Sequence, residues 1–135
     1  MTNAKNIGRY VFGIGFIAAG TNHFINTAFY VAIMPPYLPW PLVLVYLSGV
    51  AEIGFGALLL MPRWSQAAAW GLIALLLAVF PANLHMALNT ELYAWAPPAA
   101  LWLWLPLQAV LIAGAYAYTR PAKALATANG GRLKK

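Results

Sequence analysis

Seven polar side chains interrupt the long apolar stretches of this chain. They are Asn22, His23, Ser48, Glu52, Asn83, His85 and Gln108. Carboxyl, imidazole and amide groups are costly to bury among hydrocarbon, so they usually face a bundle interior or a wet cavity and mark a functional site. We therefore expect the seven to supply the hydrogen-bond donors and acceptors of a ligand-binding pocket. No metal site is predicted.

Two interpretations of Glu52 stay open. The carboxyl group is either a site for a proton, a cation or a polar headgroup, or a structural acid bonded to Gln108, Ser48 or a histidine. The histidines have their own alternative, because His23 and His85 on two helices could be the axial ligands of a b-type haem. Nothing else in the sequence favours haem, so hydrogen-bonded imidazoles are the preferred interpretation.

Several chemistries are excluded by composition. The chain has no cysteine, so it cannot by itself form a disulfide, relay thiols or attach haem covalently. It also lacks a phosphate-binding glycine loop, a Ser/His/Asp arrangement and paired carboxylates, and Glu91 stands alone in a connecting loop. No self-contained catalytic constellation is visible, which leaves open a role as a subunit of an oxidoreductase.

Four apolar stretches must position these side chains. They cover about residues 7–25, 42–61, 64–88 and 99–119, and each is close to the roughly 20 residues that cross a bilayer as a helix. The chain is 63% hydrophobic and 7% charged, which is incompatible with a water-soluble domain of this size. The prediction is an all-α integral membrane four-helix bundle over residues 1–121, followed by a basic cytoplasmic tail, residues 122–135.

The basic residues set the orientation. All eight lie before or in the first turn of the first span, between the second and third, or after the fourth, whereas the other two connections have none. Positive charge accumulates on the cytoplasmic side, so both termini are predicted to be cytoplasmic. The bilayer, with its anionic headgroups, is the expected partner of this charge, and nucleic acid is not.

The spacing of small and polar residues predicts how the spans pack. Gly49 and Gly56 lie beside the Ser48 and Glu52 face of the second span, and the first span has Gly8, Gly15 and Asn22 at the same spacing of seven. Small residues let membrane helices approach closely, so these two spans should pack through the glycine stripes. Counting 1.5 Å per residue puts Glu52 and Gln108 near mid-membrane, a turn or two deeper than both histidines.

Prolines predict breaks and kinks. Pro81 and Pro106 fall inside the third and fourth spans, where each removes a backbone hydrogen bond and should open a small polar cavity. The connection from Asn26 to Trp40 is rich in proline yet too apolar for a free aqueous loop. We expect it to lie in the membrane interface or to fold back over the mouth of the bundle.

Five motifs follow one another along the chain: Gly20-Thr-Asn-His23-Phe24, Pro35-Pro-Tyr37 with Pro39, Ser48-Gly49-Val-Ala-Glu52, Phe80-Pro81-Ala-Asn83-Leu-His85-Met86 and Leu105-Pro106-Leu107-Gln108. In this order they resemble the motifs of the DoxX-like family of small four-span membrane proteins. The similarity covers about residues 7–119. It carries the family's motif residues over to Asn22, His23, Glu52, Pro81, Asn83, His85, Pro106 and Gln108.

The resemblance implies a redox-associated accessory subunit in a bacterial cytoplasmic membrane, with a quinone headgroup or another small polar ligand in the pocket. A redox partner protein or a homo-oligomer would be its assembly. The missing cysteines argue against the thiol chemistry of some relatives. Two alternatives stay open, namely a transporter of protons or small solutes centred on Glu52 and a structural or assembly protein without its own ligand.

Overall fold

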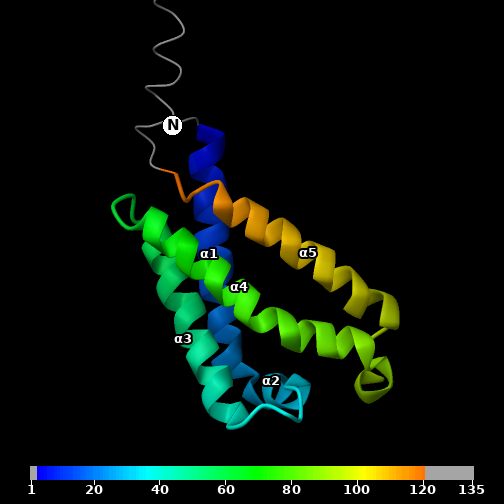
Figure 1. The fold of residues 1–135 in the computed structure, drawn as a ribbon. Helices are drawn as coiled ribbons and strands as arrows, with labels where there is room; N and C mark the ends of the chain where they lie inside the picture. Colours follow the sequence, from blue (N-terminus) through cyan, green and yellow to red (C-terminus); the bar gives the residue numbers. More distant parts are fainter. Residues whose placement is uncertain (1–2, 121–135) are drawn as a thin grey trace, which may run out of the picture.

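A computed structural model describes residues 3–120, and the secondary-structure elements in this part of the chain are all helices. The helices in order are α1 (Asn3–Ile25), α2 (Thr27–Ile33), α3 (Pro41–Leu60), α4 (Ser65–Leu88), the short 3-10 helix η1 (Thr90–Tyr93) and α5 (Pro98–Tyr116) (Figure 1). The four long helices coincide with the four predicted stretches to within a few residues. The predicted tail, residues 122–135, lies outside the described residues.

Proline sets several of these boundaries. Pro41 and Pro98 occupy the first positions of α3 and α5, where a missing N–H costs nothing because the first turn has no intrahelical acceptor to meet. Pro81 lies inside α4 and Pro106 inside α5. Helix α4 changes direction along its length (Figure 1), as expected for a helix that contains proline.

Helices α1 and α3 are antiparallel and in close backbone contact. A methyl group built on Gly20 would lie 2.6 Å from the Gly49 carbonyl oxygen, and one built on Gly56 would lie 2.7 Å from that of Gly13. Two facing glycine pairs, seven residues apart on each helix, therefore hold the helices together. The predicted role of Gly49 and Gly56 is confirmed.

The partner stripe on α1 was predicted at the wrong glycines. Gly15 has nothing within 4 Å of its added methyl group, and Gly8 meets Tyr118 rather than α3. A spacing of seven occurs twice on α1, and the sequence alone does not show which of the two glycine stripes faces α3. Gly13 and Gly20 form the contact.

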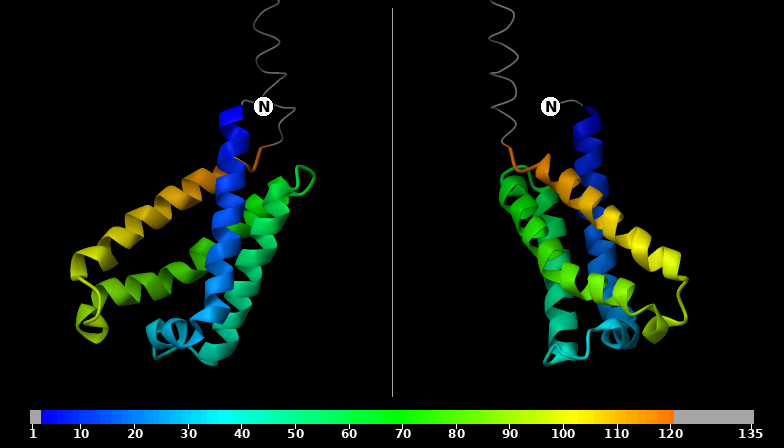
Figure 2. Two further views of the ribbon diagram at one scale, coloured as in Figure 1. Left: turned by 180° about the vertical axis from the view of Figure 1, so that it is seen from behind. Right: turned by 45° about the vertical axis from the view of Figure 1, so that its right-hand side comes forward.

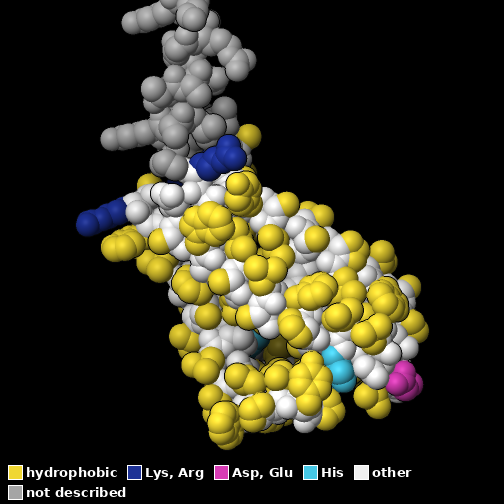
Figure 3. Space-filling view, viewed as in Figure 1, with side chains coloured by type: hydrophobic (Ala, Val, Ile, Leu, Met, Phe, Trp, Pro, Cys, Tyr) yellow, Lys and Arg dark blue, Asp and Glu magenta, His cyan; other side chains and the backbone are white. Residues whose placement is uncertain are grey.

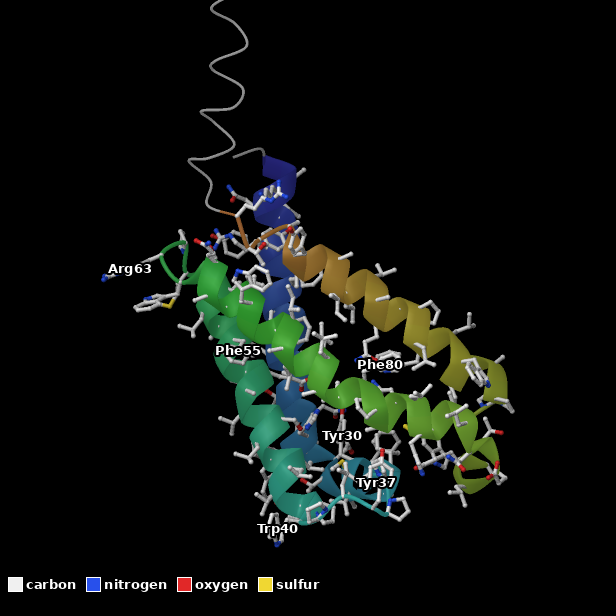
Figure 4. The ribbon with its side chains drawn as sticks, viewed as in Figure 1. Tyr30, Tyr37, Trp40, Phe55, Arg63 and Phe80 are labelled. Atoms are coloured by element: carbon white, nitrogen blue, oxygen red, sulfur yellow. The ribbon has the colours of Figure 1, made fainter. Side chains whose placement is uncertain are left out.

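Basic residues gather at one end of the molecule, called the basic end here, which includes Lys5, Arg63 and Arg120. On the face drawn in Figure 3, the visible lysine and arginine side chains lie at this end and an acidic side chain lies toward the other end. Trp40 and Arg63, just beyond the two ends of α3, lie far apart (Figure 4). Arg9 is 5% exposed, and its guanidinium donates to the carbonyl oxygens of Leu59 and Leu60 at 3.0 and 2.8 Å. It thereby satisfies carbonyls at the end of α3 that have no intrahelical partner.

The half of the bundle near the basic end is solidly packed. Its buried core joins Phe16, Leu59, Leu72, Leu76 and Tyr118 with several alanines, and Phe12, Phe55 and Leu111 pack against it. At the other end α4 and α5 diverge from α1 (Figure 2). The segments α2 and η1 lie at this open end. These two segments are called the lid below, and this end of the molecule is called the lid end.

Three helices, Pro41–Leu60, Ser65–Leu88 and Pro98–Tyr116, are long and apolar enough to cross a membrane. Large apolar side chains cover the outside, among them Val11, Leu47, Val50, Leu103 and Val110, each at least 59% exposed. An apolar surface of this extent is suited to lipid and not to water. The protein is an integral membrane protein in contact with the bilayer. The first of the four predicted spans, α1, is not among the three candidates.

Candidate functional site

A cavity of about 480 Å³ lies at the lid end, between α1 and α3 on one side and α4 and α5 on the other. Apolar side chains make up most of its wall, and Phe29, Tyr30, Ile33 and Met34 of the α2 region close it. The surface is hollowed beneath α4 (Figure 3). The prediction that the Asn26–Trp40 connection folds back over the bundle mouth is confirmed. The structure brings five of the predicted site residues to the wall: His23, Ser48, Glu52, Asn83 and Gln108.

The orientation of the His23 ring is determined by a backbone carbonyl group. Its Nδ1 lies 3.0 Å from the Val45 carbonyl oxygen and 3.2 Å from Ser48 Oγ. A carbonyl oxygen only accepts, so Nδ1 carries a hydrogen. Ser48 donates its own hydroxyl hydrogen to the same carbonyl at 3.0 Å, which leaves its oxygen as an acceptor toward His23.

The other ring nitrogen faces the carboxyl group. His23 Nε2 and Glu52 Oε2 are 3.0 Å apart. With Nδ1 already protonated, one further proton is shared between these two atoms, as a neutral acid beside a neutral imidazole or as a carboxylate beside an imidazolium. Both states have zero net charge, which makes the pair tolerable in an apolar environment.

For His23, this pairing corrects the expectation that Glu52 lies a turn or two deeper than the histidines. The count along each helix considers only the backbone level. Side chains tilt toward the N-terminus of their own helix, and α1 and α3 are antiparallel, so His23 and Glu52 lean toward each other. Of the acceptable partners named for a structural acid, the structure selects a histidine.

A tyrosine from the α2 segment, which is not among the seven predicted site residues, completes this wall. The Tyr30 ring stacks on His23 with centroids 4.0 Å apart, and its hydroxyl oxygen accepts from Asn22 Nδ2 at 2.7 Å. Tyr30 belongs to α2, at the lid end of the molecule (Figure 4). Asn22 therefore supports the site from behind and does not line the cavity. The sequence feature that could have indicated the role of Tyr30 was the apolar character of the Asn26–Trp40 connection.

The opposite wall carries a chain of two amides. Gln108 is 2% exposed, and its Nε2 donates to the Leu76 carbonyl oxygen while its Oε1 accepts from Asn83 Nδ2 at 2.8 Å. Pro81 has no N–H for the neighbouring Leu77 carbonyl, so this part of α4 has unusual hydrogen-bonding needs. Gln108 donates to the carbonyl of Leu76 and not to that of Leu77, which Pro81 leaves without its helical donor.

The second histidine lies apart from this arrangement. His85 does not line the cavity, and its Nδ1 is 3.2 Å from the Tyr93 hydroxyl oxygen. That hydroxyl also lies 3.4 Å from the Ile33 carbonyl oxygen, so it connects η1 with the end of α2. Burial raises the pKa of Tyr93 above its ordinary value, with a smaller contribution from Tyr37. His85 therefore supports the lid.

The chemistry available is recognition through hydrogen bonds. Within residues 3–120 no group of three or more side chains could hold a metal ion. Polar groups on two facing walls, with an apolar surround that includes Trp95 and Trp104, suit a small amphiphilic molecule.

Comparisons with known proteins place the chain in a family. Neither curated proteins nor solved structures match it. A family model described as a domain of unknown function, DUF8561, matches residues 12–119, which include all four long helices in whole or in large part. The chain belongs to the DUF8561 family.

Proposed function

We propose that this protein spans the bacterial cytoplasmic membrane four times, with residues 1–121 as one DoxX-like domain and with both termini cytoplasmic. The fourth span would be α1. Its 23 residues measure about 34 Å at 1.5 Å per residue, enough for a bilayer core. It also packs along α3 through Gly13 and Gly20. The basic end would face the cytoplasm, in agreement with the positive-inside rule.

The function that the site supports best is binding of a quinone headgroup or another small polar ligand within the membrane. The cavity carries this proposal, because it joins a His23–Glu52 pair on one wall with an Asn83–Gln108 pair on the other inside an apolar surround. Its volume of about 480 Å³ lies in the range of small-molecule sites. The protein would act as an accessory subunit of a redox system, with a protein partner or a second copy beside it.

An amphiphile could reach this cavity from the lipid. Phe29, Trp95 and Trp104 line it while remaining 44%, 59% and 48% exposed, so the wall formed by these aromatics meets the surface. The rings of Phe29 and Trp95 touch at a centroid distance of 5.2 Å. A headgroup at His23 and Glu52 would then leave its apolar tail among the exposed aromatics and the acyl chains.

The packed core favours a closed pocket over a conduction path. Phe16, Leu59, Leu72, Leu76 and Tyr118 fill the bundle between the cavity and the basic end. A transporter centred on Glu52 would need a polar route through this core. In liposomes with a pH gradient we expect no proton flux that depends on Glu52, and such a flux between pH 5 and 8 would favour the transporter instead.

The test is to identify what the purified protein carries. We expect organic extraction and mass spectrometry to find a quinone or another small amphiphile, in amounts that fall in Glu52→Gln. Glu91→Gln is the matched control, because Glu91 is exposed in η1 and away from the cavity. Absence of any such molecule, together with a quinone-linked phenotype that Glu52→Gln leaves unchanged, would refute the proposal.

A further inference from the structure

The cavity has a definite hydrogen-bond polarity, meaning that the free oxygen atoms on its two polar walls can accept hydrogen bonds but not donate them. On each wall this polarity follows from a hydrogen bond to a backbone carbonyl group. On the first wall the Val45 carbonyl puts a hydrogen on His23 Nδ1, so the proton shared with Glu52 lies between Nε2 and Oε2. Glu52 Oε1 then has no hydrogen in either protonation state of the pair. It can only accept.

The second wall follows the same rule. The Leu76 carbonyl accepts from Gln108, which fixes the amide nitrogen of Gln108 at that end and its oxygen toward Asn83. Asn83 must in turn direct Nδ2 at Gln108, and its Oδ1 makes no hydrogen bond within the described chain. That atom can only accept as well.

Both oxygens remain reachable from the cavity. Among the described side chains, the sealed-off polar atoms outside the hydrogen bonds given above are Arg9 Nε and Glu52 Oε2, and the latter faces His23 Nε2 at 3.0 Å. Glu52 Oε1 and Asn83 Oδ1 do not belong to that set, and both residues line the cavity. The two walls therefore offer two acceptors to an occupant.

From this polarity we infer that the site selects a ligand whose polar end is a hydroxyl group, such as a quinol or another phenol, over the corresponding carbonyl or ether. This inference rests on the proposed binding function and specifies its ligand class. A hydroxyl donates to Glu52 Oε1 or Asn83 Oδ1. The Tyr30 hydroxyl accepts from Asn22 and keeps its own hydrogen, so it can donate to the ligand oxygen.

A quinone carbonyl fits less well. It can accept from Tyr30 or from an indole N–H of Trp95 or Trp104, but it leaves Glu52 Oε1 and Asn83 Oδ1 without a partner once water is displaced. An unmet acceptor in an apolar site weakens binding, and each lost hydrogen bond corresponds to roughly threefold to tenfold in affinity.

The experiment compares ligands that differ in this one feature. The full chain in lipid nanodiscs is titrated by calorimetry with 4-octylphenol and with 4-octylanisole, and empty nanodiscs correct for partition into lipid. We expect the phenol to bind at least threefold more tightly. A second pair, decylhydroquinone under anaerobic conditions and decylbenzoquinone, should show the same direction. Tighter binding of the hydroquinone than of octylphenol would identify a quinol, and equal binding a general hydroxyl site.

Variants assign the preference to the two acceptors. Glu52→Gln and Asn83→Leu should each reduce the ratio between phenol and anisole toward one, whereas Glu91→Gln should keep it. Equal affinity of the wild-type protein for phenol and anisole would overturn the inference and leave the binding function standing. If neither the octyl pair nor the decyl pair binds, the proposed function falls with it. A ratio that survives both cavity variants would also overturn the assignment.

Discussion

The contact between α1 and α3 allows a sharp test with a single methyl group. In Gly20→Ala the new Cβ would lie 2.6 Å from the Gly49 carbonyl oxygen, 2.8 Å from Ile53 Cγ1 and 2.9 Å from Glu52 Cβ. Two of these three atoms belong to a backbone or to the first carbon of a side chain, so they cannot move without shifting the helix. Gly15→Ala is the matched control, because its Cβ meets nothing within 4 Å.

The magnitude follows from two opposing terms. Replacing glycine by alanine inside a helix gains up to about 1 kcal/mol of helix stability at either position. Overpacking at Gly20 costs about 1–3 kcal/mol, and this cost is absent at Gly15. The helix term cancels in the difference between the variants, so Gly20→Ala should be about 1–3 kcal/mol less stable than Gly15→Ala.

The free energy of unfolding is measured in mixed micelles by titration with a denaturing detergent, followed by helical circular dichroism. A parallel measurement of ligand binding adds a functional signal, because the methyl group also displaces Glu52. If Gly20→Ala is as stable as Gly15→Ala, the close approach of α1 and α3 is not correct. Gly54→Ala, whose Cβ also has open space, should behave like Gly15→Ala.

Three further predictions use the same unfolding assay. Arg9→Met removes two hydrogen bonds to the end of α3 and should lower the free energy of unfolding by about 2–3 kcal/mol. The control Arg63→Met, at an exposed turn, should change it by less than about 0.5 kcal/mol. Equal effects of the two substitutions would contradict the capping role of Arg9. Gln108→Leu removes the bond to the Leu76 carbonyl and leaves Asn83 Nδ2 without its acceptor, which should cost about 1–3 kcal/mol, so a neutral effect would count against the amide chain. The raised pKa of Tyr93 means that the folded state holds its proton more tightly, so its contribution is complete below pH 10.0 and is lost as pH rises above that value. Tyr93→Phe should lose less stability than the wild-type protein between pH 9 and 11.5, and an identical loss would refute this.

Much of the architecture follows from sequence because lipid leaves few options. A stretch of about 20 apolar residues must be helical to satisfy its own backbone, and prolines such as Pro41 and Pro98 fix where helices begin. Five of the seven polar residues could be assigned to one cavity from their scarcity alone. The short helix α2 was not predicted as a helix, because its seven residues are too few for a clear periodic pattern.

The finer geometry of the site depended on helix rotation and side-chain direction. Gly13 was not distinguished from Gly15, because a spacing of seven fits either stripe. The Glu52–His23 contact arises from the opposite tilt of side chains on antiparallel helices, which a count of residues by depth does not include. Tyr30 was missed as a site residue because a connecting segment has no register to place it against His23. The transmembrane arrangement, the termini and the ligand stay predictions.

The lid has a consequence for how this protein can diversify. The residues that close the cavity from outside, including Phe29, Tyr30 and Trp95, belong to segments between the long helices. The glycine contacts and the packed core lie elsewhere. Substitutions in these connecting segments can change the size and chemistry of the admitted molecule while membrane insertion and helix pairing continue unchanged. Related chains could thus share one helical scaffold and bind different ligands.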